Sequence, residues 1–136
     1  MSGISDLPTL LASLNPVVSS DVYVFLTRPS AAYGDCAELN PIAAFLENEG
    51  LTLVVPKERA IAAGDHYQGE YGMISLGVHS DLQAVGLTAT IAKSLADRGI
   101  SANIVAAFYH DHIFVPSSRV DDAVKVLEQL AADNQT

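Results

Sequence analysis

The sequence predicts an α+β fold built from two similar units, and three observations lead to this prediction. First, the stretch from Val78 to Pro116 follows the pattern strand, helix, strand, turn and strand, with short connections. Second, the motif Val-Pro-x-x-Arg occurs at 55–59 and again at 115–119, each time between a strand pattern and a helix pattern. Third, 136 residues with 49% hydrophobic and 17% charged residues are typical of a globular chain that buries a core.

The composition excludes several classes of function. With a net charge of −9 and 7 dispersed Lys and Arg residues, the chain lacks the basic patch that binds nucleic acids or anionic membranes. Its apolar runs are too short to span a bilayer, and no basic region precedes the apolar residues of its N-terminus, so we expect a cytoplasmic protein. The single cysteine, Cys36, excludes an intrachain disulfide and lies beside Asp35 and Glu38, so we expect an ordinary loop thiol.

The first elements are a short helix, a strand and a long loop. Apolar residues at i, i+3, i+4 and i+7 predict the helix; they are Leu7, Leu10, Leu11 and Leu14. Asp6 is its expected N-cap, and Pro8 falls in its first turn. Val22 to Thr27 predicts a strand, and 28–40 has the Pro, Gly and Asp content of a loop.

The rest of the first half predicts two helices around a strand. Asn40 and Pro41 are expected to begin a helix that Gly50 ends, because Ile42, Phe45 and Leu46 have helical spacing. Leu51 to Val55 predicts a strand. A brief helix over Lys57 to Ala63 is expected to stop at Gly64.

The second half begins with a strand over Tyr71 to Val78 and a helix over Leu87 to Leu95, ended by Gly99 in the left-handed conformation. A strand over Ser101 to Tyr109, a turn at His110–Asp111 and a returning strand over His112 to Val115 should follow. The last helix is expected to begin at Ser118 as its cap, with an apolar stripe of Val120, Ala123, Val124, Leu127 and Leu130.

The two copies of the repeat differ in length, which makes the first unit a degenerate copy. Six positions separate Gly50 from Pro56, whereas 17 separate Gly99 from Pro116. No residues remain after the last helix for a closing strand, so we expect Val22 to Thr27 to complete the sheet of the other unit. The predicted domains are residues 1–68 and 69–136.

Several of these residues resemble the ACT domain, a small regulatory ligand-binding fold. Its pattern of glycine, aliphatics, a helix ending near Ala-Asp-x-Gly-Ile and a strand is matched by Gly86-Leu87 and by 95–100; the segment 49–56 resembles its counterpart in small bacterial proteins with two ACT-like units. The chain differs from the commonest pattern at Val85 and Gln83. The resemblance implies ferredoxin-like βαββα units in tandem, with antiparallel sheets covered by helices on one face.

The segment 79–86, between a strand and the long helix, is the candidate ligand site. A helix N-terminus attracts a carboxylate, Gly86 allows close approach to the backbone, and Asp81 suits an ammonium group, so the segment suits an amino acid. The resemblance implies the same place, between this loop and a neighbouring unit. The predicted contact residues are His79, Ser80, Asp81, Ala84, Val85, Gly86, Asn103, Ile104 and Glu49. The structural alternative is that Ser80 or Asp81 merely caps the helix and that Gly86 only allows close packing.

Other polar residues have weaker claims. His110, Asp111, His112 and His79 are residue types that bind metal, but the first three fall where the hairpin must turn, so we expect no metal and no cofactor. Glu47 and Glu49 lie at a predicted helix end, where an acidic group is unfavourable. His66 is expected at the surface.

The sequence therefore predicts a non-catalytic regulatory module that binds an amino acid or similar metabolite, acts on a separate enzyme or regulator, and forms a homodimer. The alternatives are an interaction module without a ligand and a small acid/base enzyme that uses Glu49, Asp81 or His79.

Overall fold

The computed structural model describes residues 3–135, which form two compact units. The central unit holds residues 20–71, and the terminal unit holds the described residues up to Ser19 and from Gly72 onward. In chain order the elements are α1 (Leu7–Ala12), β1 (Pro16–Arg28), the 3₁₀ helix η1 (Ala37–Leu39), β2 (Ala43–Glu47), β3 (Gly50–Pro56), α2 (Lys57–Ala62), β4 (Tyr71–Leu76), α3 (Leu87–Ala96), β5 (Asn103–Ala106), β6 (Asp111–Pro116), the 3₁₀ helix η2 (Ser117–Arg119) and α4 (Val120–Asp133).

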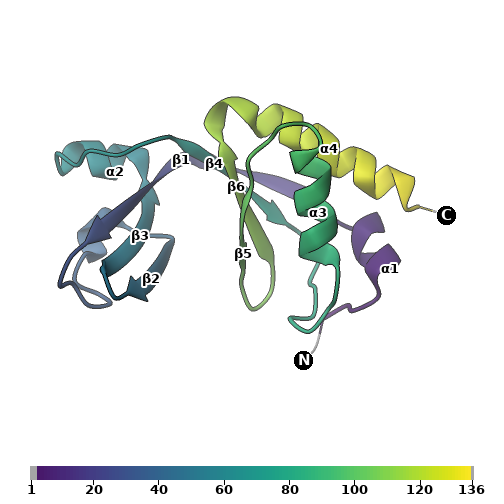
Figure 1. The fold of residues 1–136 in the computed structure, drawn as a ribbon, viewed down its shortest axis with the longest axis horizontal. Helices are drawn as coiled ribbons and strands as arrows, with labels where there is room; N and C mark the ends of the chain where they lie inside the picture. Colours follow the sequence, from purple (N-terminus) through teal and green to yellow (C-terminus); the bar gives the residue numbers. More distant parts are fainter. Residues whose placement is uncertain (1–2, 136) are drawn as a thin grey trace. The chain divides into compact units, whose positions relative to one another are not determined.

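The terminal unit packs three helices on one face of its strands. Its strands follow the order β1-β4-β6-β5, with β1 contributing Pro16–Ser19, and β5 pairs antiparallel with β6. Helices α1, α3 and α4 lie on one side of β4, β6 and β5 (Figure 1). Between helices and strands lies one cluster of buried side chains, which includes Leu10, Leu14, Ile74, Leu76, Ile91, Leu95, Ile113, Val115 and Leu127.

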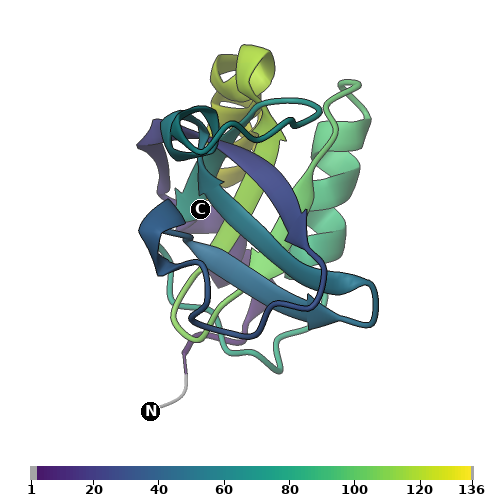
Figure 2. The same cartoon turned by 90° about the vertical axis from the view of Figure 1, so that its left-hand side faces the viewer.

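The central unit is a smaller antiparallel sheet. Its strands follow the order β2-β3-β1, and Tyr23 to Arg28 of β1 pair with β3. Figure 2 shows β2 and β3 side by side as a hairpin. Val24, Leu26, Leu51, Leu53 and Val55 form its core together with Cys36, Leu39 and Ala60. The thiol predicted to be an ordinary loop group is thus buried in this core, and His66 is exposed as predicted.

The predicted start of α1 and the predicted end of α3 are both present in the structure. Asp6 caps α1, because Thr9 N–H donates to its Oδ2 at 3.2 Å. Helix α3 buries Leu87, Ile91 and Leu95, and Gly99 follows it with φ +69°, in the left-handed region that ends helices. These predictions are confirmed.

The helix predicted between Asn40 and Gly50 is wrong, because residues 43–47 form strand β2. Glu47 pairs with Gly50 across a tight turn, and Phe45 pairs with Thr52. A helix needs a buried apolar stripe, yet Phe45 is 70% exposed and Leu46 50% exposed. Pairing with β3 satisfies the backbone instead, so sheet formation outweighs the helical spacing of three residues.

Several boundaries in the second half also differ from prediction, and strands β4 and β5 are shorter than predicted. The hairpin turn is not at His110–Asp111: Ala107 N–H donates to the His110 carbonyl at 3.1 Å, and Asp111 already pairs with Ala106 in the ladder. Asp111 is buried, which fixes it inside the strand. Ser118 does not cap α4, because it lies within η2 and Arg119 takes the N-cap position.

The arginine of each repeated Val-Pro-x-x-Arg motif donates hydrogen bonds to backbone carbonyls of a helical segment. Arg119 donates to the carbonyls of Arg98 (3.2 Å) and Gly99 (3.3 Å), where α3 ends. Arg59 donates to the Glu38 carbonyl (2.8 Å) in η1. In each unit the motif arginine therefore donates to carbonyls of a helical segment, which is the 3₁₀ turn η1 in the first copy and the end of α3 in the second.

Strand sharing is present, but through a different part of β1 than predicted. The segment Val22–Thr27 does not leave its own unit, because Tyr23 to Arg28 pair with β3. Pro16–Ser19 belong to the terminal unit, where β1 neighbours β4. The division into domains 1–68 and 69–136 is drawn from the sequence repeat and stays a prediction.

Candidate ligand-binding loop

A pocket of about 220 Å³ lies against the loop that joins β4 to α3 in the terminal unit. It is lined by Gly3, His79, Ser80, Asp81, Leu82, Gln83 and Phe108. Three of the predicted site residues, His79, Ser80 and Asp81, are thus brought together around one hollow. The pocket has polar groups on the loop side and an aromatic ring from the β5–β6 hairpin.

Ser80 holds the inner side of this loop to β6. Its Oγ donates to Asp111 Oδ2 at 3.1 Å, and Ser80 and Asp111 are only 8% and 7% exposed. A buried carboxylate needs such donors, so this contact is a strong constraint on the loop. Ser80 is therefore not a helix cap.

Asp81 shapes the loop rather than capping α3. Its Oδ1 accepts from Gln83 N–H at 2.8 Å, its carbonyl accepts from Ala84 N–H at 2.9 Å, and its own N–H donates to the Ile4 carbonyl at 2.8 Å. The side chain is partly exposed and lines the pocket. The carboxylate is thus held in place beside the hollow.

Gly86 begins α3 with φ +99°. A Cβ atom there would lie 3.1 Å from Leu7 Cδ2, so the glycine serves both backbone conformation and packing. No side chain of residues 3–135 caps α3, which leaves its first-turn N–H groups without that kind of partner. Gly86 therefore has the close-packing role, here against Leu7, that the sequence analysis gave as the alternative.

The remaining predicted residues lie outside this pocket's lining. Ala84 and Ile104 pack against the core of the terminal unit, whereas Val85 is 84% exposed and Asn103 is exposed on β5. Glu49 lies in the exposed β2–β3 turn of the central unit, not at a helix end. The pocket brings none of these five residues to its wall.

Gly3 and Phe108 are pocket residues that the sequence analysis missed. Both are remote in sequence from the loop, and no local pattern marks them. Phe108 packs on Tyr109 with ring centroids 5.0 Å apart, and Tyr109 lies 5.2 Å from the ring of His79. Aromatic rings therefore stand beside the polar loop.

His110 and His112 have hydrogen-bond partners within the terminal unit. His110 Nδ1 lies 3.3 Å from the Val78 carbonyl, and His112 Nδ1 lies 2.7 Å from Ser75 Oγ. Burial lowers the pKa of His112, and the neighbouring His110 lowers it further. In the described residues 3–135, no three His, Cys, Asp or Glu side chains gather as metal ligands.

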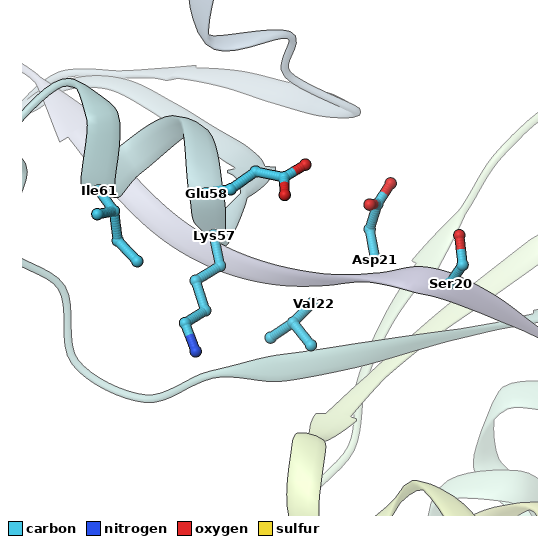
Figure 3. A pocket seen from close by; sticks show the side chains of 6 residues that line it. All are labelled: Ser20, Asp21, Val22, Lys57, Glu58 and Ile61. Carbon is cyan, nitrogen blue, oxygen red and sulfur yellow. The ribbon is translucent and has the colours of Figure 1, made fainter.

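A second hollow, of about 320 Å³, lies in the central unit (Figure 3). It is lined by Ser20, Asp21, Val22, Lys57, Glu58 and Ile61. The carboxylates of Asp21 and Glu58 lie on one side, while Lys57 extends the other way to Glu70, 3.1 Å from its Oε1. The lysine lowers the pKa of Glu70. The Lys57 ammonium group is thus paired with Glu70 of the same unit.

Comparison with known proteins places this geometry in a family. Models of the ACT domain match residues 2–72 and residues 68–129. No curated protein sequence matches the chain. The chain belongs to the ACT-domain family and consists of two ACT-type units, the class of fold found in small-molecule-binding regulatory modules.

Solved structures agree with this assignment. A Vibrio cholerae protein of unknown function, described as a possible transport protein, is 46% identical with a TM-score of 0.84, over 96% of this chain and 99% of that one. The regulatory subunit of aspartate kinase from Thermus thermophilus, in a ligand-free form, is 12% identical with a TM-score of 0.64, over 88% and 97%. An Agrobacterium tumefaciens protein is 16% identical with a TM-score of 0.71, over 86% and 88%. The last two similarities concern the fold. None of the helices within residues 3–135 is both long and apolar enough to cross a membrane.

Proposed function

We propose that this protein is a non-catalytic regulatory module that binds an amino acid, or a metabolite with similar charges, at the β4–α3 loop. The observation that supports this proposal is the pocket lined by His79, Ser80 and Asp81 at the approach to α3. Drug-sized ligands occupy roughly 300–1,000 Å³. A hollow of about 220 Å³ therefore suits a smaller molecule.

The charges around the loop suit a zwitterion. The N–H groups of the first turn of α3 favour a carboxylate. Asp81 lines the hollow and its carboxylate favours an ammonium group, and the net charge of −9 adds a field of the same sign. Phe108 offers an apolar surface for a side chain.

The output of such a module is a shift between conformations or partners. A ligand acts only through different affinities for two states of the protein. The partner we propose is a separate enzyme or regulator in the cytoplasm, by analogy with the aspartate kinase regulatory subunit of similar fold.

A thermal-shift screen with the proteinogenic L-amino acids tests the ligand. A compound at a hundred times its dissociation constant adds about 2.7 kcal/mol of stability. We expect the shift to disappear in Asp81→Ala and Gly86→Val and to persist in Asp97→Ala, which removes an exposed carboxylate from the far end of α3. A shift that survives Asp81→Ala would place the ligand elsewhere.

The alternatives give different results in the same screen. An interaction module shows no shift with any compound. An acid/base enzyme using Glu49, Asp81 or His79 would consume a binding compound, which chromatography of the mixture detects. The position of Glu49 in the exposed β2–β3 turn gives this alternative little support.

We further propose a homodimer through the edge strand β2. This strand ends the sheet order and exposes Phe45 by 70% and Leu46 by 50%, with no lysine or proline to block pairing. Sedimentation should show a dimer that Phe45→Lys dissociates. Ile61→Lys, which changes an equally apolar residue 56% exposed on α2, should leave it intact. A monomeric wild type would refute the dimer.

A further inference from the structure

We propose that the segment Gly3–Ser5 docks reversibly on the loop and completes the pocket wall through Gly3, and that Gly3 is the residue that lets it dock. The part of this inference that concerns ligand binding rests on the proposed function, whereas the docking of the segment does not. It assigns a positioning role to residues far from the loop in sequence.

The segment forms an isolated parallel bridge with the loop. Ile4 N–H donates to the His79 carbonyl at 2.9 Å, and the Ile4 carbonyl accepts from Asp81 N–H at 2.8 Å, on either side of an isolated bridge between Ile4 and Ser80. The bridge thus binds the backbone on both sides of Ser80. It thereby ties down the backbone of His79 and Asp81, two residues of the pocket wall.

Gly3 makes this approach possible. A Cβ atom at residue 3 would lie 2.5 Å from the His79 carbonyl oxygen and 2.9 Å from the carbonyl carbon of Ser80. Both are backbone atoms, and Ser80 cannot retreat because its hydroxyl is bonded to the buried Asp111. Any side chain at this position must therefore push the segment off the loop.

Ile4 and Ser5 of the segment are exposed, whereas helix α1, which comes directly after it, is packed through buried Leu10 and Leu11. Ile4 is 38% exposed, so its docking depends on main-chain hydrogen bonds more than on burial. In contrast, Asp6 caps α1, and Leu10 and Leu14 are fully buried. An exposed segment that is docked through backbone hydrogen bonds opens locally at low free-energy cost.

Because Gly3 lines the same pocket as Asp81, a ligand there touches both the loop and the docked segment. Ligand binding and docking then stabilise each other, and by linkage each changes the other by the same factor. The segment is thus the part of the pocket whose position reports occupancy.

Amide hydrogen exchange followed by NMR tests the docking without any ligand. We compare the wild type with Gly3→Ala and with the control Ser5→Ala, an exposed residue of the same segment. In Gly3→Ala the Asp81 amide, and with it the Gln83 amide in the turn that Asp81 closes, should exchange at least about tenfold faster. Ser5→Ala should match the wild type, and unchanged Ile74 and Phe114 amides show that the fold persists.

Wild-type exchange at Asp81 in Gly3→Ala would overturn the docking role. Faster exchange at Asp81 with full protection at Gln83 would overturn the positioning of the loop. For any L-amino acid that binds the wild type, the dissociation constant should rise about tenfold in Gly3→Ala and stay constant in Ser5→Ala; an unchanged constant in Gly3→Ala overturns the coupling. If no amino acid binds the wild type, the proposed function fails, and the exchange at Gln83 still decides the positioning role.

Discussion

Arg28 and Asp65 form a two-pronged ion pair inside the central unit. Nη1 and Nη2 of Arg28 donate to Oδ1 and Oδ2 of Asp65 at 2.8 and 2.7 Å, and the side chains are 31% and 18% exposed. This hydrogen bonding lowers the pKa of Asp65 and raises that of Arg28. The pair ties the segment after α2 to the end of β1.

We expect Asp65→Asn to lower the free energy of unfolding by about 1–2 kcal/mol, because the half-buried guanidinium loses its charged partner. Urea denaturation measures the loss. The control is Asp97→Asn, whose exposed pair with Lys93 contributes less than about 0.5 kcal/mol. Equal effects of the two changes would contradict the assignment.

His112 makes stability depend on pH near neutrality. Because burial lowers its pKa below the usual 6.5, the unfolded chain takes up a proton at a higher pH than the folded chain does. With respect to His112, the free energy of unfolding therefore has its full value above pH 6.5. It falls as the pH drops from 6.5 toward the pKa of His112 in the folded protein. His110 adds to this effect, and Asp111 opposes it.

Urea melts between neutral and mildly acidic pH check the sign. His112→Gln should flatten the fall in stability below pH 6.5, whereas His66→Gln, at an exposed position, should preserve it. The Asp65 carboxylate, with its lowered pKa, adds a separate loss only at pH values below about 3.8. A wild-type profile that rises on acidification would contradict the His112 argument.

At the scale of elements, the repeated Val-Pro-x-x-Arg motif connects a strand end to a helix end. Arg119 donates to the last carbonyls of the α3 turn and pairs with Asp122 in α4. It thus binds two helices through one side chain. Arg59 binds η1 in the same manner in the central unit.

Arg119→Ala should therefore destabilise the protein by about 1 kcal/mol, because the α3 carbonyls and Asp122 lose a donor. Thermal unfolding measures the change. Arg98→Ala removes an exposed guanidinium nearby while keeping its carbonyl, so we expect a change close to zero. If both variants melt alike, the motif arginine has no special role.

At the scale of the whole molecule, the terminal unit takes residues from both ends of the chain. Leu10 and Leu11 of α1, and Leu14 just after it, lie in the same core as α3 and α4, and Pro16–Ser19 extend the sheet of this unit. The second half of the sequence is thus incomplete by itself.

We expect the fragment 69–136 to remain largely unfolded, because the apolar surface that α1 covers would be exposed. Circular dichroism measures its structure. Mixing it with fragment 1–68 should restore the helical signal, since the missing leucines return. A fragment 69–136 that unfolds cooperatively on its own would show that α1 is dispensable.

The sequence predicted well those features that short segments specify. The end of α3 at Gly99, the cap at Asp6 and the strand before each Val-Pro motif depend on neighbouring residues, and the resemblance of 86–100 to the ACT domain was confirmed. It failed at β2, where three apolar residues have helical spacing but pairing with β3 decides the structure.

For the candidate site, the sequence by itself determined the loop: a strand, a polar segment and a helix opened by Gly86. Only the tertiary structure decided that Ser80 binds the buried Asp111, that Phe108 reaches the pocket, and that Gly3 lies on the backbone of His79. The physical reason is distance along the chain. Caps and turns depend on backbone groups a few residues away, whereas these contacts join segments that only the packed core brings together.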